Sequence, residues 1–131
     1  RRLREEFPDV EIVGVEPERS PVLSEGVDAA GEHDYQGMGP GFVSENLDID
    51  LLDDVETVPL EDAEVECRRL AREEGILVGQ SSGAAGLVAK RVADRLATDA
   101  DSTPDADRDE PLVVALFPDG GGRYLSTGLF D

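Results

Sequence analysis

Four short apolar runs, separated by stretches of helical periodicity, restrict most strongly what this chain can fold into. Val10–Val15 and Val55–Val58 are rich in β-branched residues, and a proline follows each run within two residues, as at the end of a strand. Ile76–Val78 is apolar throughout, as in a parallel strand covered by helices on both faces. Leu112–Phe117 is the fourth run. The order strand, loop, strand, helix, strand, helix, strand predicts an α/β layer structure with mostly parallel strands.

Three segments have the signature of helices. Residues 1–6 read as the end of a helix that the following proline stops. Residues 60–74 have near-helical apolar spacing, with acidic residues in the first turn, basic residues near the end and Gly75 as the stop. Another helix is predicted to open at Ser81 and to run to about Leu96.

Two segments are predicted to be irregular. Residues 19–46 contain several glycines and no clear period, so we expect a long ordered loop, and loops of this length are usually functional or disordered. Residues 99–110 are strongly acidic and poor in apolar residues, which indicates a solvated surface insertion.

The charge excludes some classes of partner. Lys and Arg number 12 and Asp and Glu number 31, so the net charge is 12 − 31 = −19. Nucleic acids and anionic membranes bind basic surfaces, so neither is expected as a partner. Lys90 is the only lysine, and a surplus of carboxylates with so little lysine indicates adaptation to high salt. A disordered acidic tail is the alternative, but 39% hydrophobic residues can support a core.

The cysteine and methionine content points to a cytoplasmic, soluble protein and to a piece of a longer one. Cys67 is the only cysteine, so no internal disulfide can form, which fits a reducing compartment. No apolar run is long enough to span a bilayer, and no signal-peptide pattern is present. The chain begins with Arg, and Met38 is its only methionine, so we expect that it does not begin at a translation start.

Two segments are candidates for a ligand site, because ligands of α/β sheets bind beyond the carboxyl ends of the strands. Residues 79–85 contain Ser81 and Ser82 between a predicted strand and a predicted helix, and serine can donate or accept a hydrogen bond. Either serine could instead be only the N-cap of that helix. Residues 118–122 contain three consecutive glycines, which permit close backbone approach, although a plain turn is the default interpretation.

Other chemically active side chains are interpreted as structural. His33, the only histidine, has no serine or cysteine partner at motif spacing, so a catalytic triad cannot be argued. Cys67 is expected in the core, and one Cys with one His makes no metal site. Lys90 falls about two turns into its helix, away from the predicted strand ends, which makes it a poor Schiff-base residue.

Three segments together resemble one known family. They are Gln-Gly-Met-Gly-Pro-Gly-Phe at residues 36–42 with Asn-Leu-Asp at 46–48, the stretch at residues 73–85, and Phe-Pro-Asp-Gly-Gly-Gly-Arg-Tyr-Leu-Ser-Thr at residues 117–127. Their order and spacing resemble the C-terminal part of cysteine synthases, the O-acetylserine sulfhydrylase branch of the pyridoxal-phosphate enzymes with the tryptophan-synthase-β-like fold. The resemblance implies that residues 1–131 are the C-terminal part of the large cofactor-binding domain, a three-layer, mostly parallel sheet domain of fold type II.

The resemblance also implies roles for individual residues. Ser81 would hydrogen-bond the pyridine nitrogen of pyridoxal 5'-phosphate, with Pro118 and Asp119 beside that edge of the ring. Gly37, Met38 and Gly39 would form a loop at the substrate entrance. The Schiff-base lysine and the phosphate cradle of the family lie upstream of this sequence, so no catalytic residue is expected in the chain, and we expect the isolated chain to be inactive.

The implied activity is the synthesis of cysteine from O-acetylserine and sulfide, by β-elimination and β-replacement on the cofactor. The resemblance further implies a homodimer for the full-length protein, with serine acetyltransferase as a candidate partner. Two alternative functions stay open. One is a cystathionine β-synthase of the same fold, acting on serine, and the other is a non-catalytic acidic α/β module that binds another protein.

Overall fold

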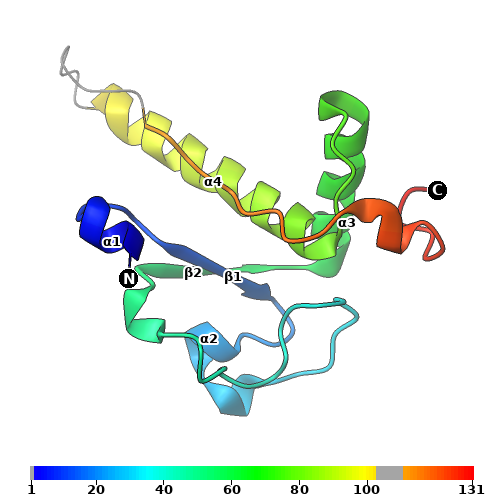
Figure 1. The fold of residues 1–131 in the computed structure, drawn as a ribbon, viewed down its shortest axis with the longest axis horizontal. Coiled ribbons are helices and arrows are strands. Elements are labelled where there is room, and N and C mark those ends of the chain that lie inside the picture. The colour runs from blue at the N-terminus through cyan, green and yellow to red at the C-terminus, as the bar shows by residue number, and fades with distance from the viewer. Residues whose placement is uncertain (1, 103–110) are drawn as a thin grey trace. The chain divides into compact units, whose positions relative to one another are not determined.

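The computed structural model describes residues 2–102 and 111–131 and divides the chain into two compact units, residues 1–60 and residues 61–131 (Figure 1). The prediction of an α/β fold with parallel strands is confirmed. Of the predicted acidic insertion, residues 103–110 lie outside the described residues, whereas residues 99–102 continue a helix.

The sheet of the first unit has two parallel strands, β1 (Val13–Pro17) and β2 (Asp54–Val58). β2 lies where it was predicted, but β1 begins three residues later than expected and includes its closing proline. Pro17 has no amide hydrogen, so it is tolerated at the end of a strand. The register pairs Val15 with Glu56, which is the midpoint of both strands.

Asp53 joins three segments at the beginning of this sheet. Its Oδ2 accepts hydrogen bonds from the Arg4 guanidinium and from the Ile12 amide, each at 2.7 Å. Arg4 belongs to α1 (Arg2–Glu6), the short helix predicted at this end, and also donates to the Leu51 carbonyl at 3.0 Å. The hydrogen bond from Arg4 lowers the pKa of Asp53. This carboxylate is therefore exposed but paired.

The predicted loop at residues 19–46 contains two short helices, α2 (Val22–Glu25) and η1 (Val27–Ala29), and η2 (Ile49–Leu51) follows it. The side chain of Glu16, near the end of β1, stabilises the start of α2. It is buried and accepts hydrogen bonds from the Leu23 amide at 2.7 Å, from the Ser24 amide at 3.0 Å and from the Ser24 hydroxyl at 2.6 Å. A carboxylate from a neighbouring segment thus satisfies the first amides of the helix, which local propensity does not reveal.

Helices dominate the second unit. α3 (Leu60–Arg69), which starts at the boundary, continues as one π-helical turn, η3 (Leu70–Glu74), and ends at Gly75 with φ of 70°, as predicted. α4 (Gln80–Ser102) is longer than predicted, and η4 (Gly121–Tyr124) begins within the glycine run. Among the described residues, no helix combines the length and the apolarity that crossing a membrane requires.

α3 and α4 approach closely at Gly83, where an added Cβ would collide with the Ala63 carbonyl and the Cys67 sulfur. One buried hydrophobic cluster lies beside this crossing. It consists of Cys67, Leu70, Val78, Tyr124 and Leu129, against which Phe130 packs. The prediction that Cys67 is a core residue is confirmed.

Two predicted strands are wrong. Ile76–Val78 is extended but forms only one antiparallel bridge, between Val78 and Gly120, and Leu112–Phe117 is not a strand in the described part of the chain. Leu112 and Leu116 are 86% and 81% exposed, while the residues between them alternate in burial. A strand needs a hydrogen-bonding neighbour, and residues 111–117 have the alternating pattern without that neighbour. The segment runs alongside α4 in Figure 1.

A buried carboxylate joins α3 to α4. The Glu66 side chain is 4% exposed, and its oxygens accept hydrogen bonds from Arg69 at 2.9 to 3.1 Å and from Lys90 at 3.3 Å. Burial alone would raise the pKa of Glu66, but the hydrogen bonds and charges of Arg69 and Lys90 outweigh it, so the net pKa is lowered. Lys90 is thus engaged in an ion pair, in line with its interpretation as a poor Schiff-base residue.

Two glycines of α4 provide a matched test of the helix crossing. We expect Gly83→Ala to destabilise the protein by about 1–3 kcal/mol, because a methyl group there overpacks the α3 contact. At Gly86 the nearest atoms to an added Cβ lie at 3.5 Å or more. Gly86→Ala should therefore stabilise the protein by about 0.5–1 kcal/mol, through helix propensity. Urea denaturation measures both, and equal effects would contradict the close crossing.

Glu66→Gln should lower the melting temperature by several degrees at neutral pH. The folded pKa of Glu66 lies below its unfolded value, so ionised Glu66 stabilises the fold above roughly pH 4.3, and this contribution is lost as the pH falls through the folded pKa. The difference between the wild type and Glu66→Gln should therefore shrink in acid. Glu73→Gln is the control, because that side chain is 64% exposed. A difference that did not depend on pH would refute the ion pair.

Candidate functional site

The segment before α4 and the segment before η4 lie side by side, as the two candidate sites in the sequence require. The Gly79 amide donates to the Asp119 carbonyl at 3.3 Å, and the Gly121 amide donates to the Leu77 carbonyl at 3.0 Å. The bridge between Val78 and Gly120 lies between these bonds. The serine turn (residues 79–82) and the glycine run (residues 120–122) therefore form one candidate site within the second unit.

The two serines of this site differ in burial and in bonding. Ser82 is fully buried, and its hydroxyl lies 3.4 Å from the Asp119 carbonyl oxygen and 3.5 Å from Asp119 Oδ1, at the long limit for a hydrogen bond. Ser81 is half-buried, and its hydroxyl has no hydrogen-bond partner within residues 2–102 and 111–131. α4 begins at Gln80, so neither serine is the N-cap. The Ser81 hydroxyl is available to a ligand.

Asp119 is held by a tyrosine whose role the sequence did not reveal. The Tyr124 hydroxyl donates to Asp119 Oδ2 at 3.0 Å. Burial raises the pKa of Tyr124, and the Asp119 carboxylate raises it further, so the hydroxyl stays protonated as a donor. An added Cβ on Gly79 would collide with the Asp119 carboxylate and the Tyr124 ring, so this close packing requires glycine. Pro118, the other predicted ring neighbour, is exposed.

Cys67 contacts the same turn, but its thiol is unreactive. Its thiol donates to the Gly79 carbonyl at 3.2 Å. Burial raises the pKa of the Cys67 thiol to about 11, so the nucleophilic thiolate is not formed near neutral pH. Cys67 supports the turn and is not a nucleophile. Among the residues that the structure describes, no group of His, Cys, Asp and Glu could hold a metal ion.

The glycine-rich loop of the first unit has an unusual backbone. Gly37, Gly39 and Gly41 have φ values of 89°, 68° and 78°, in the left-handed region that favours glycine. An added Cβ on Gly39 would also lie 2.8 Å from His33 Nε2 and collide with Pro17. The loop that contains Gly37, Met38 and Gly39 thus has a shape that other residues could not easily adopt.

His33 braces this loop. Its Nδ1 accepts a hydrogen bond from the Tyr35 amide at 3.2 Å, so Nε2 carries the hydrogen and donates it to the Gly39 carbonyl at 2.8 Å. Tyr35 is in turn buried, and its hydroxyl donates to the carbonyls of Val58 and Pro59. His33 is therefore structural, as predicted, but its contact with Gly39 was not expected from the sequence.

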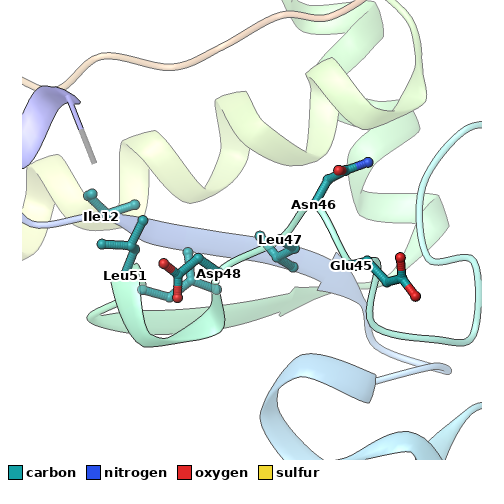
Figure 2. Close-up of a pocket in the computed structure, with 7 residues that line it drawn as sticks. Ile12, Glu45, Asn46, Leu47, Asp48 and Leu51 are labelled. Carbon is teal, nitrogen blue, oxygen red and sulfur yellow. The ribbon is translucent and has the colours of Figure 1, made fainter.

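A pocket of about 700 Å³ also lies in the first unit. Figure 2 shows Ile12 and Leu51 near one another with Asp48 beside Leu51, while Glu45 and Asn46 lie toward the other end and point in different directions. Its polar groups do not converge on one point, so the pocket lacks the arrangement that orients a small ligand. The serine turn of the second unit is the better candidate site.

Comparison with known proteins identifies the class. A family model described as pyridoxal-phosphate dependent enzyme matches residues 1–103. The chain therefore belongs to the family of pyridoxal-phosphate dependent enzymes, which confirms the class inferred from the three motif segments.

The relatives point to one branch of that family. A probable cysteine synthase of Bacillus subtilis is 44% identical over 129 residues, which are 98% of this chain and 37% of the relative. The crystal structure of an Entamoeba histolytica cysteine synthase is 30% identical, with a TM-score of 0.78 over 98% of this chain and 35% of that one. The crystal structure of an O-ureido-L-serine synthase is 37% identical, with a TM-score of 0.79 over 98% of this chain and 37% of that one. The chain thus spans little more than a third of the length of these proteins.

The difference between the two serines can be tested without any ligand. Ser82→Ala should lower the free energy of unfolding by about 1 kcal/mol, because it removes a buried hydroxyl from the Asp119 backbone. Ser81→Ala should change it by less than about 0.5 kcal/mol, because that hydroxyl has no partner to lose. Urea denaturation of the cofactor-free protein gives both values, and a larger loss at Ser81 would reverse the assignment.

Proposed function

We propose that this chain is the C-terminal portion of a longer pyridoxal-phosphate-dependent cysteine synthase, which makes cysteine from O-acetylserine and sulfide. The observation that carries the proposal is the half-buried, unpartnered Ser81 hydroxyl at the first turn of α4. The family match and the cysteine synthase relatives support it. They do not favour the alternative of a non-catalytic acidic binding module.

The residues around Ser81 fit the nitrogen edge of the cofactor. Ser81 would hydrogen-bond the pyridine nitrogen, while Gly120 and Gly122, where an added Cβ would meet no atom closer than 4.0 Å, leave room for a flat ring, and Pro118 and Asp119 would border it. When bound, pyridoxal phosphate acts as the electron sink for bonds that break at the substrate's α-carbon. A neutral hydroxyl does not hold the ring nitrogen protonated as a carboxylate would. Ser81 therefore suits β-elimination of a good leaving group such as acetate.

We assign the substrate side of the site to the loop braced by His33. Gly37, Met38 and Gly39 would border the amino-acid substrate, because Gly37 and Gly39 hold the loop in a left-handed backbone shape and have no side chains that would block it. The substrates, O-acetylserine and sulfide, are small enough for such an entrance.

The proposal places the remaining parts of the enzyme outside this chain. The Schiff-base lysine and the phosphate cradle would belong to the rest of the protein, so residues 1–131 contain no catalytic residue and should be inactive alone. We further propose a cytoplasmic homodimer, adapted to high salt, with serine acetyltransferase as a candidate partner. The net charge of −19 is the observation behind the salt adaptation.

The full-length protein tests the proposal. Purified with pyridoxal phosphate, it should form cysteine from O-acetylserine and sulfide, with serine replacing O-acetylserine poorly. Ser81→Ala should raise the cofactor Kd about tenfold, the effect of losing one hydrogen bond of about 1.4 kcal/mol. Absorbance titration and a cysteine assay measure these quantities. Turnover of serine but not of O-acetylserine would favour a cystathionine β-synthase, and failure to bind pyridoxal phosphate would refute the proposal.

A further inference from the structure

We propose that Tyr124 and Asp119 are positioning residues, a side-chain clamp that holds the turn at Gly79–Ser82 and thereby sets the direction of the Ser81 hydroxyl. The role of Ser81 in this statement rests on the proposed function. The clamp itself is defined by contacts within the second unit and can be tested without the cofactor.

Asp119 contacts the turn through its backbone and approaches it through its side chain. Its carbonyl accepts from the Gly79 amide at 3.3 Å and lies 3.4 Å from the Ser82 hydroxyl. Its carboxylate packs against Gly79, at a distance that only glycine permits. Asp119 therefore contacts the residues on both sides of Ser81, while Ser81 itself stays available.

The Tyr124 hydroxyl determines where the carboxylate lies. Tyr124 is 3% exposed, and its ring belongs to the core formed with Cys67, Leu70, Val78 and Leu129. The rigid, buried ring donates the shorter of the two side-chain hydrogen bonds to this carboxylate, at 3.0 Å to Oδ2 against 3.5 Å from the Ser82 hydroxyl to Oδ1. Phenylalanine would fill the same core volume, so the hydroxyl can be removed without removing the ring.

Electrostatic attraction alone would not fix the position of the Asp119 carboxylate. The first turn of the 23-residue helix α4 has no acidic residue of its own, and the amino-terminal end of the helix dipole attracts a negative charge. That attraction favours the Asp119 carboxylate near the helix start but allows many rotamers. The directional hydrogen bond from Tyr124 selects one of them.

The first test uses the full-length protein without cofactor. Tyr124→Phe should increase hydrogen exchange of the amides in residues 79–83 about tenfold, because the turn loses its clamp and opens more often. Thr98→Val is the matched control, since it removes a hydroxyl that bonds the Asp94 carbonyl on an exposed part of the same helix. Unchanged exchange in Tyr124→Phe, or an equal increase in Thr98→Val, would overturn the clamp.

The second test measures the cofactor and the reaction. Tyr124→Phe should raise the Kd for pyridoxal phosphate about threefold to tenfold, shift the absorbance band of the bound cofactor, and lower kcat while KM for O-acetylserine changes less than about twofold. Asp119→Asn retains an acceptor for Tyr124 and should have the smaller effect. Combining Tyr124→Phe with Asp119→Ala should give a loss no larger than the greater single loss, because both remove one interaction. Additive losses, or a change in KM alone, would contradict the proposal.

The two tests separate this inference from the proposed function. If exchange rises in Tyr124→Phe but the wild type binds no pyridoxal phosphate, the clamp stands and the cysteine synthase proposal fails. If the wild type is an active, cofactor-bound cysteine synthase and Tyr124→Phe alters neither exchange nor the absorbance band, the function stands and the clamp fails.

Discussion

The hydrogen bond from the Gly79 amide to the Asp119 carbonyl is the contact on which the second unit depends. It joins two segments that are forty residues apart in the chain, and the Val78–Gly120 bridge and the Tyr124 hydroxyl act next to it. Because the donor is the residue just before α4, this contact determines where the long helix starts. Glycine is required there, since any side chain would enter the space that Asp119 and Tyr124 occupy.

In the first unit, polar side chains that hydrogen-bond to backbone groups have a comparable role. Glu16 satisfies the amides at the start of α2, and His33 connects the Tyr35 amide to the Gly39 carbonyl. In both cases a polar side chain shapes a segment that has too few apolar residues to fold by packing. A loop with three glycines in the left-handed region thus acquires one conformation. Pre-organisation of this kind lowers the conformational entropy that a loop loses when it binds a ligand.

Local patterns in the sequence were sufficient to predict helices but not all strands. The apolar spacing of residues 60–74 and the stop at Gly75 predicted the helix and its end correctly, whereas the π-helical turn at Leu70–Glu74 was not predicted. Residues 76–78 and 112–117 have strand-like composition, yet a strand also needs a neighbour, which composition does not supply. The family motifs singled out Ser81 and Asp119, whereas the contacts of Tyr124 with Asp119 and of His33 with Gly39 depend on geometry that no local pattern encodes.

The apolar segment beside α4 has a consequence for how this polypeptide behaves in solution. Leu112, Val114 and Leu116 project outward from an extended backbone that no described strand pairs with. Such an edge is a template for another β-strand, and identical chains carry the same edge. Self-association through this edge competes with folding, and the high negative charge of the chain opposes it by repulsion between copies. Salt, which screens that repulsion, therefore favours self-association through this edge.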